Sequence, residues 1–362
     1  MTRNAGYELI LASMRRRARS HTDMDTYMST FWRGVYLSAW AVILLSQPSI
    51  ASAETLAERW MRHLESRIAT ASESLVGVMG VAAQRTDGGP RVLFNSDSAF
   101  PMASTYKIAI AATVLATVDR GDISLDDMVA IKPDELIAGS GKITTDFYHR
   151  GVAVSVANLV ELMITESDNT ATDKLLGLVG GTAAVTKQLE AMGVTDQRVD
   201  RATAEILQDF YNLDQPATAS FVAEVFTRSP EIITKLSIKN LRFETDERDQ
   251  STPAAMLELL LALDRGHLSS HSTTFLLSTL SRTRTGDTRL RALLPLGTPI
   301  AHKTGTIGGV ANDVGFVNLP DGSQLAIVVF TKSSDSDPEM RDRSIAEVAR
   351  VLFEGYLLLG AL

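Results

Sequence analysis

The segment that most constrains the fold is PIAHKTGTIGGVANDVGFVNLPDGSQLAIVVFTKS, residues 299–333. Its three runs of β-branched and apolar residues are separated by a Gly-rich turn and by a Pro-Asp-Gly turn, which predicts three strands. Strands joined by such short turns pair with their neighbours in antiparallel fashion. We therefore expect this part of the chain to supply an antiparallel sheet.

The N-terminal part of the chain adds to this sheet. Residues 75–85 and 90–97 read as two strands separated by the turn TDGG. Helical spacing of apolar residues predicts amphipathic helices over 54–71 and 338–359, and a mainly helical pattern from about 104 to 275. We therefore predict one α/β domain, in which helices flank an antiparallel sheet and an all-helical lobe is inserted between its strands.

Residues 1–53 differ in character from the rest. Arg33 precedes an apolar run over 34–45, and small residues follow at 51–53. This is the pattern of a signal peptide with a long N-terminal extension, and it predicts cleavage after Ala53. The apolar run is shorter than the ~20 residues that span a bilayer. We expect a periplasmic or secreted protein without stable membrane insertion, with an uncleaved anchor as the alternative.

The amino-acid composition restricts the catalytic groups, cofactors and partners that this chain can use. The chain has no cysteine, which excludes disulfides, thiol catalysis and thiolate metal sites. Its six histidines show no metal-binding spacing, so we predict neither a metal nor an organic cofactor. The net charge of −8 argues against nucleic acid or anionic lipid as a partner. We expect a monomer that acts on a small-molecule substrate.

The first candidate catalytic motif is MASTYKIAI, in which Ser104 and Lys107 open a predicted helix. Residues three apart share a helix face, so the Lys107 amine can reach the Ser104 hydroxyl. A serine needs an adjacent base to become a nucleophile, and a desolvated lysine can serve. On its own this motif also occurs in ordinary surface helices.

The second motif is TESDNTATDKLL, with Ser167 and Asn169 between two helical stretches. The Ser167 hydroxyl can relay a proton to a leaving group. The Asn169 amide can accept a hydrogen bond from Lys107 and donate one to a substrate carbonyl. A plain helix N-cap is the simpler interpretation of Ser-Asp-Asn alone.

The third motif is AHKTGTIGG, with Lys303, Thr304, Gly305 and Thr306 on a predicted strand. Glycine lets a ligand or another backbone approach closely. Lys303 can hold an anion or make the Ser167 hydroxyl more acidic. The alternative is an edge-strand lysine followed by turn residues.

All three motifs in this order resemble the penicillin-recognising serine hydrolases, and their class A β-lactamase branch in particular. The resemblance runs from about Glu54 to the C-terminus. It is supported by ERDQSTPAAMLELL (247–260), TRTGDTRLRALLP (283–295) and HKTGTIGGVANDVGF (302–316). It implies the α/β serine β-lactamase/DD-peptidase fold, with the site where the lobes meet.

The resemblance also implies roles for these residues. Ser104 is expected to form the acyl-enzyme, with Lys107 in the base system and Ser167 protonating the departing nitrogen. The backbone N–H groups of Ser104 and Thr306 are expected to form the oxyanion hole. The residues expected to hold the substrate, mainly through its carboxylate, are Asn169, Lys303, Thr304, Gly305, Thr306 and Arg289. A surface position is the alternative for Arg289.

One expected residue is missing. Class A enzymes free the serine with a glutamate in a loop that opens with Asp-Arg-aromatic-Glu and closes with Arg-Asp. Here Asp200-Arg201 and Arg248-Asp249 match these ends, but Thr203 stands in the place of the glutamate. The loop, residues 201–249, is also much longer than that of the family; we call it the enlarged loop.

Three interpretations of this loop remain open. Glu205 activates the water from a displaced position; an acid later in the loop, such as Asp209, Glu244 or Asp246, folds back; or no acid is present and the acyl-enzyme is long-lived. The predicted function is a β-lactamase. The alternatives are a D-Ala-D-Ala peptidase acting on peptidoglycan-like substrates, an esterase, or a slowly deacylating penicillin-binding protein or sensor.

Overall fold

The structure is a computed structural model that describes residues 55–147, 149, 151–229 and 238–360. The chain divides into two units, residues 1–55 and 56–362, and almost all described residues belong to the second. The predicted signal peptide and its cleavage site lie outside the described residues. No helix within the described ranges is long and apolar enough to cross a membrane.

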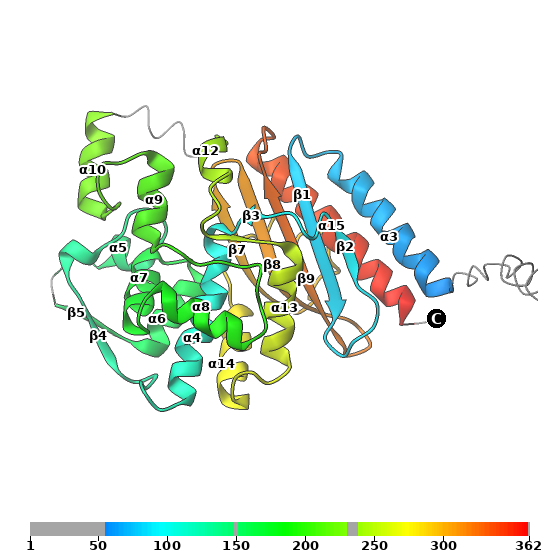
Figure 1. The fold of residues 1–362 in the computed structure, drawn as a ribbon, viewed down its shortest axis with the longest axis horizontal. Coiled ribbons are helices and arrows are strands. Elements are labelled where there is room, and N and C mark those ends of the chain that lie inside the picture. The colour runs from blue at the N-terminus through cyan, green and yellow to red at the C-terminus, as the bar shows by residue number, and fades with distance from the viewer. Residues whose placement is uncertain (1–54, 148, 150, 230–237, 361–362) are drawn as a thin grey trace, which may run out of the picture. The chain divides into compact units, whose positions relative to one another are not determined.

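A five-stranded antiparallel sheet forms the centre of the second unit (Figure 1). Its strand order is β2-β1-β9-β8-β7, so strands from the two ends of the chain are neighbours. The strands are β1 (Val78–Arg85), β2 (Val92–Phe94), β7 (Ile300–Ile307), β8 (Val310–Asn318) and β9 (Gln324–Lys332). The predicted sheet is therefore confirmed.

Helices cover both faces of the sheet, which explains why side chains on both faces of the central strand β9 are buried. Along β9, Ile327 and Val329 belong to the core under the terminal helices, whereas Val328 and Phe330 belong to the core of the other face. The terminal helices are α3 (Leu56–Ser72) and α15 (Pro338–Leu359), which lie side by side (Figure 1). Side chains alternate between the two faces of a strand, and because helices cover both faces of this sheet, both sets of side chains are buried.

The other face carries the helical lobe, built around α4 (Lys107–Asp119), which is almost completely buried. Helix α13 (Pro253–Asp264) contacts β1 and β9 directly. The remaining helices described here are α5 (Lys142–Asp146), α6 (Val156–Thr165), α7 (Asn169–Leu178), α8 (Thr182–Ala191), α9 (Thr203–Tyr211), α10 (Ala219–Arg228), α12 (Leu241–Glu244) and α14 (Ser270–Leu280). The predicted inserted helical lobe is thus confirmed.

Short elements complete the described fold. They are β3 (Phe100–Pro101) paired with β6 (Gln250–Ser251), β4 (Met128–Ile131) paired with β5 (Val152–Ser155), and the 3₁₀ turns η1 (Ala103–Tyr106) and η2 (Pro133–Glu135). The β3–β6 pair joins the segment before the nucleophile to the end of the enlarged loop. The pairing therefore ties this loop to the sheet side of the candidate site.

A buried ion pair closes the base of the enlarged loop. Arg201 Nε lies 2.5 Å from Asp249 Oδ2, and both side chains are 5% exposed. The second carboxylate oxygen, Asp249 Oδ1, accepts the backbone N–H groups of Asp200 at 2.7 Å and Arg201 at 3.1 Å. This ion pair clamps the base of the enlarged loop, which contains α9, α10 and α12; residues 230–237 lie outside the described ranges.

Replacing Asp249 by asparagine is expected to destabilise the protein by about 3–5 kcal/mol, because it leaves the buried Arg201 charge with fewer partners. Chemical denaturation measures this loss as a lower transition midpoint. Asp122→Asn is the matched control, since the Arg120–Asp122 pair is more than half exposed at both side chains. That change is expected to cost less than about 1 kcal/mol. Equal losses in the two variants would contradict a clamp role for Asp249.

Candidate active site

Ser104 lies in η1, immediately before α4, and its side chain is partly exposed. Ala103 before it has φ = 45°, a left-handed conformation that non-glycine residues rarely adopt. Strand β7 passes directly beside this turn: a Cβ placed on Gly305 would lie 2.6 Å from Met102 O and 3.0 Å from Ser104 N. Gly305 is therefore required for the sheet to reach the nucleophile's backbone.

Lys107 is fully buried, one turn after Ser104. Its Nζ donates to Ser167 O at 2.7 Å and to Asn169 Oδ1 at 2.9 Å, and it lies 3.3 Å from Ser167 Oγ. Burial lowers the pKa of Lys107 to about 7, against the opposing effect of the Asp168 and Asp173 charges. A substantial fraction of this amine is neutral near pH 7, as a general base requires.

A second lysine amine, from strand β7 of the sheet, contacts Ser167. Lys303 Nζ lies 3.1 Å from Ser167 Oγ and donates to Thr304 O at 2.8 Å. Burial lowers the pKa of Lys303, and the nearby Lys107 charge acts in the same direction. Ser167 itself has φ = 56°. Its hydroxyl therefore bridges two buried amines, an arrangement suited to proton relay.

The other two residues of the second motif have different roles: Asp168 stabilises a helix, and Asn169 contacts Lys107. Asp168 is the N-cap of α7: its carboxylate accepts Ala171 N and Ile143 N, each at 2.8 Å. The Asn169 amide accepts from Lys107 and donates to Ala138 O at 2.7 Å. The capping interpretation therefore holds for Asp168, whereas Asn169 is directed at the lysine.

The remaining residues predicted to hold substrate gather around β7. Arg289 is only 7% exposed, which excludes a surface position. Its guanidinium donates to Thr306 Oγ1 at 2.7 Å and Gly305 O at 3.1 Å, and pairs with Asp342 at 2.7 Å. Thr304 Oγ1 lies 2.6 Å from Thr285 Oγ1. Arg289 thus supports the strand and leaves Thr306 exposed beside the nucleophile.

The structure does not bring Glu205 to these residues. Its side chain is exposed, and its carboxylate accepts Ala202 N at 2.8 Å in the first turn of α9. Glutamate favours such positions because the helix N-terminus carries partial positive charge. Glu205 therefore caps α9 from the solvent side.

The later acids of the enlarged loop also have other partners. Asp209 pairs with Arg201 at 2.5 Å, and Asp246 pairs with Arg248 at 2.5 Å. The Glu244 carboxylate accepts Ser333 N at 2.6 Å. These carboxylates therefore stabilise the loop and its attachment to the sheet.

Two residues that sequence reasoning missed, Tyr106 and Asp173, contact Thr203, which stands at the position of the expected acid. The Thr203 hydroxyl lies 2.6 Å from the buried Tyr106 hydroxyl, and Thr203 N donates to Asp173 at 2.7 Å. A signal for Asp173 was available: it follows Asn169 by four residues and so shares its helix face. Tyr106 gave no such signal, because its partner lies 97 positions away in the sequence.

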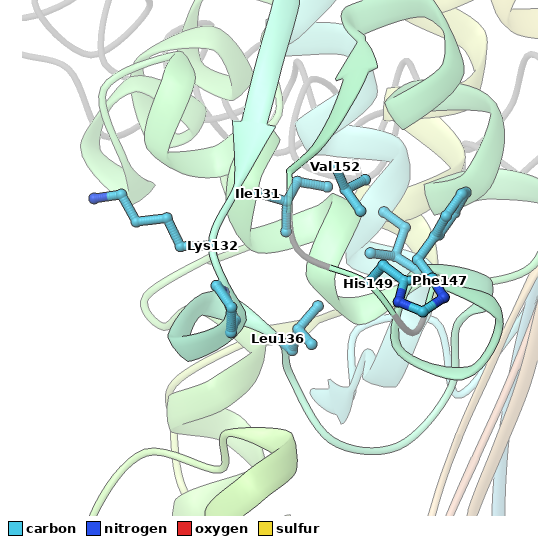
Figure 2. A pocket seen from close by; sticks show the side chains of 8 residues that line it. Ile131, Lys132, Leu136, Phe147, His149 and Val152 are labelled. Atoms are coloured by element: carbon cyan, nitrogen blue, oxygen red, sulfur yellow. The ribbon is translucent and has the colours of Figure 1, made fainter.

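A cavity in the helical lobe is distinct from this site. A cavity of about 200 Å³ opens between the ends of β4 and β5 and is lined by Ile131, Lys132, Pro133, Leu136, Ile143, Phe147, His149 and Val152. Figure 2 shows the Lys132 side chain extending away from the other labelled side chains. None of the motif residues lines this cavity. Within the described ranges, no group of three or more metal-ligating side chains is placed to hold a metal ion.

A buried lysine one turn after a serine, with a second serine held between two lysines, defines a serine hydrolase of the Ser-x-x-Lys class. The profile of the β-lactamase enzyme family matches residues 63–356, and the chain belongs to this family. The predicted resemblance is thereby confirmed.

Relatives and solved structures agree with this assignment. Beta-lactamase VEB-1 of Pseudomonas aeruginosa is 30% identical over 288 residues, covering 77% of this chain and 85% of that protein. The extended-spectrum β-lactamase PER-1 of the same organism is 29% identical, with 76% and 82% covered. A solved ancestral class A β-lactamase is 33% identical with a TM-score of 0.66, covering 80% of this chain and 99% of that structure.

Proposed function

We propose that this protein is a β-lactamase that hydrolyses the β-lactam amide through an acyl-enzyme on Ser104. The observation that carries the proposal is the position of Ser167 Oγ, within 3.3 Å of Lys107 Nζ and 3.1 Å of Lys303 Nζ, beside the nucleophile's helix. The Lys107 amine can take the proton of the Ser104 hydroxyl, and the Ser167 hydroxyl can deliver a proton to the leaving nitrogen. The family match and the names of the relatives support this substrate class.

Acylation follows from these contacts. Ser104 Oγ attacks the lactam carbonyl carbon, and its proton passes to the neutral Lys107 amine. The carbonyl oxygen gains negative charge, which the Ser104 and Thr306 backbone N–H groups stabilise. The carbon–nitrogen bond then breaks, and the nitrogen takes the Ser167 hydroxyl proton, which the Lys107 ammonium replaces. Lys303 and exposed Thr306 hold the substrate carboxylate.

Hydrolysis of the acyl-enzyme needs a base for water, and Thr203 cannot accept that proton as a carboxylate does. We assign this task to Lys107 as well, which is neutral again once acylation is complete. Water attacks the ester carbon and gives a proton to Lys107, the carbon–Oγ bond breaks, and Lys107 returns the proton to Ser104. The presence of Thr203 in place of the family's glutamate favours a second candidate, a penicillin-binding protein that deacylates slowly.

One experiment separates these candidates. The protein without its predicted signal peptide is mixed with a chromogenic cephalosporin, while absorbance and intact mass are followed together. Sustained turnover with little adduct is the result expected of a β-lactamase. A stable adduct on Ser104 without turnover would instead favour a D-Ala-D-Ala peptidase or a slowly deacylating penicillin-binding protein, and the absence of any adduct would favour an esterase. Ser104→Ala is the control and should show neither adduct nor turnover.

We also propose that the protein acts as a monomer in the periplasm or outside the cell. The apolar run and the small residues at 51–53 support export. Fractionation of cells that make the full chain, with mass measurement of the exported form, tests this. Cleavage after Ala53 is the expected result; retention of the intact chain in the membrane fraction would support the anchor instead.

A further inference from the structure

Residues 283–286 pack against β7, which is the last strand in the order of the sheet. Thr283 Oγ1 donates to His302 O of this strand at 2.6 Å. A Cβ placed on Gly286 would collide with Thr304 Cγ2, so the backbone of the segment lies directly on the strand. The segment lies outside the three motifs, yet it contacts the strand that carries the third of them.

The first hydroxyl along this strand with a hydrogen to offer is that of Thr306. A threonine hydroxyl has one hydrogen to donate and two positions at which it accepts, whereas a guanidinium only donates. Arg289 Nη2 lies 2.7 Å from Thr306 Oγ1, so the Thr306 hydroxyl is the acceptor in this contact. Its own hydrogen is not used there, and because Thr306 is exposed, a substrate group can receive it.

The second such hydroxyl comes from Thr285 or Thr304, whose Oγ1 atoms lie 2.6 Å apart. A contact of this length is a hydrogen bond in which one hydroxyl donates and the other accepts. The accepting hydroxyl keeps its hydrogen for another partner. Thr304 is only 6% exposed, whereas Thr285 is partly exposed. This difference favours Thr304 as the donor and Thr285 as the hydroxyl that can still donate to a substrate.

We propose that Thr285 binds the carboxylate of the β-lactam substrate directly, and that Thr304 orients it. Thr304 donates to Thr285 Oγ1, and Thr285 donates its own hydrogen to a carboxylate oxygen, alongside Lys303 and Thr306. The inference rests on the proposed function, because it takes a β-lactam that carries a carboxylate as the substrate. It adds a binding residue from outside the motifs and gives Thr304 an indirect role.

The test compares two substrates that differ only in this group. They are a chromogenic cephalosporin with a free carboxylate and the methyl ester of the same compound. The second-order rate of reaction is measured by absorbance for each, with intact mass to confirm the adduct on Ser104. The ratio of the two rates, acid over ester, reports recognition of the carboxylate. The wild-type protein is expected to react faster with the acid.

Thr285→Val keeps the shape of the side chain but removes the hydroxyl. We expect it to lower the acid-to-ester ratio by about 10-fold or more, the usual effect of losing a hydrogen bond to a charged group. Thr304→Val leaves the Thr285 hydroxyl in place, so the ratio should fall less. Thr285→Ser restores a hydroxyl and should restore the ratio. If Thr285→Val does not fold, Thr285→Ala replaces it with the same expectation.

Thr283→Val is the matched control. It removes the hydrogen bond from the same segment to His302 O, but the Thr283 side chain is buried and its hydroxyl is used in that bond. Loosening of the segment from β7 would change the rates with acid and ester alike. The variant is therefore expected to lose stability in thermal denaturation while keeping the wild-type ratio.

Each outcome decides for or against the proposal. A wild-type ratio in Thr285→Val would overturn it, as would a fall of the same size in Thr283→Val. A larger fall in Thr304→Val than in Thr285→Val would assign the carboxylate to Thr304 and also overturn it. A fall in Thr285→Val that Thr285→Ser restores supports it. Failure of the wild-type protein to react with either compound would instead refute the proposed function.

Discussion

Replacing Lys107 by methionine is expected to slow acylation of Ser104 by about 10²–10⁴-fold, the usual contribution of a general base. Methionine fits a fully buried site and retains the length of the stem, but it cannot accept the serine proton. The measurement is the second-order rate of adduct formation with a chromogenic cephalosporin, read by intact mass.

The pH dependence of the rate of adduct formation gives a second test of the role of Lys107. Burial lowers the pKa of Lys107 to about 7, so the amine is protonated below that pH and cannot act as a base. The wild-type rate should therefore rise as pH increases through about 7. The Lys107→Met variant should lose this rise with pH as well as most of its acylation rate. An unchanged limb in the variant would assign the titration, and the role of base, to another group.

Replacing Gly305 by alanine is expected to disable acylation by a different route. The new Cβ would lie 2.6 Å from Met102 O and 3.0 Å from Ser104 N, both backbone atoms that cannot move aside independently. Overpacking of this kind costs about 1–3 kcal/mol. The displaced strand should also carry Thr306 N away from the carbonyl oxygen of the substrate. Losing one hydrogen-bond donor of the oxyanion hole costs about 10²–10³-fold in rate.

Gly177→Ala is the matched control for that prediction. Gly177 lies within α7, and a Cβ added there meets no atom within 4 Å. Alanine is expected to stabilise the protein there by about 0.4–1 kcal/mol and to leave acylation unchanged. Thermal denaturation and the adduct rate together decide the result. Wild-type acylation in Gly305→Ala would show that β7 can withdraw from the nucleophile without cost.

The sheet, the terminal helices and the inserted lobe could be predicted because each depends on local patterns. The turns within 299–333 and the helical spacing of 54–71 and 338–359 are properties of neighbouring residues. The Arg201–Asp249 ion pair is different: it joins residues 48 positions apart, and the resemblance to the family pointed to it by matching the two short segments that contain them. Asp173 shared a helix face with Asn169, so it was within reach of sequence reasoning but carried no motif of its own.

The sequence by itself determined the elements, the three motifs and the presence of Thr203 at the position of the family's glutamate, because these depend on which residues stand at which spacing. Only the tertiary structure decided which acid serves which task. Glu205 caps α9 from solvent, Asp209 pairs with Arg201, and Asp173 accepts the first backbone N–H groups of α9. Carboxylates are alike in sequence, and what distinguishes them is the set of donors that packing brings to each.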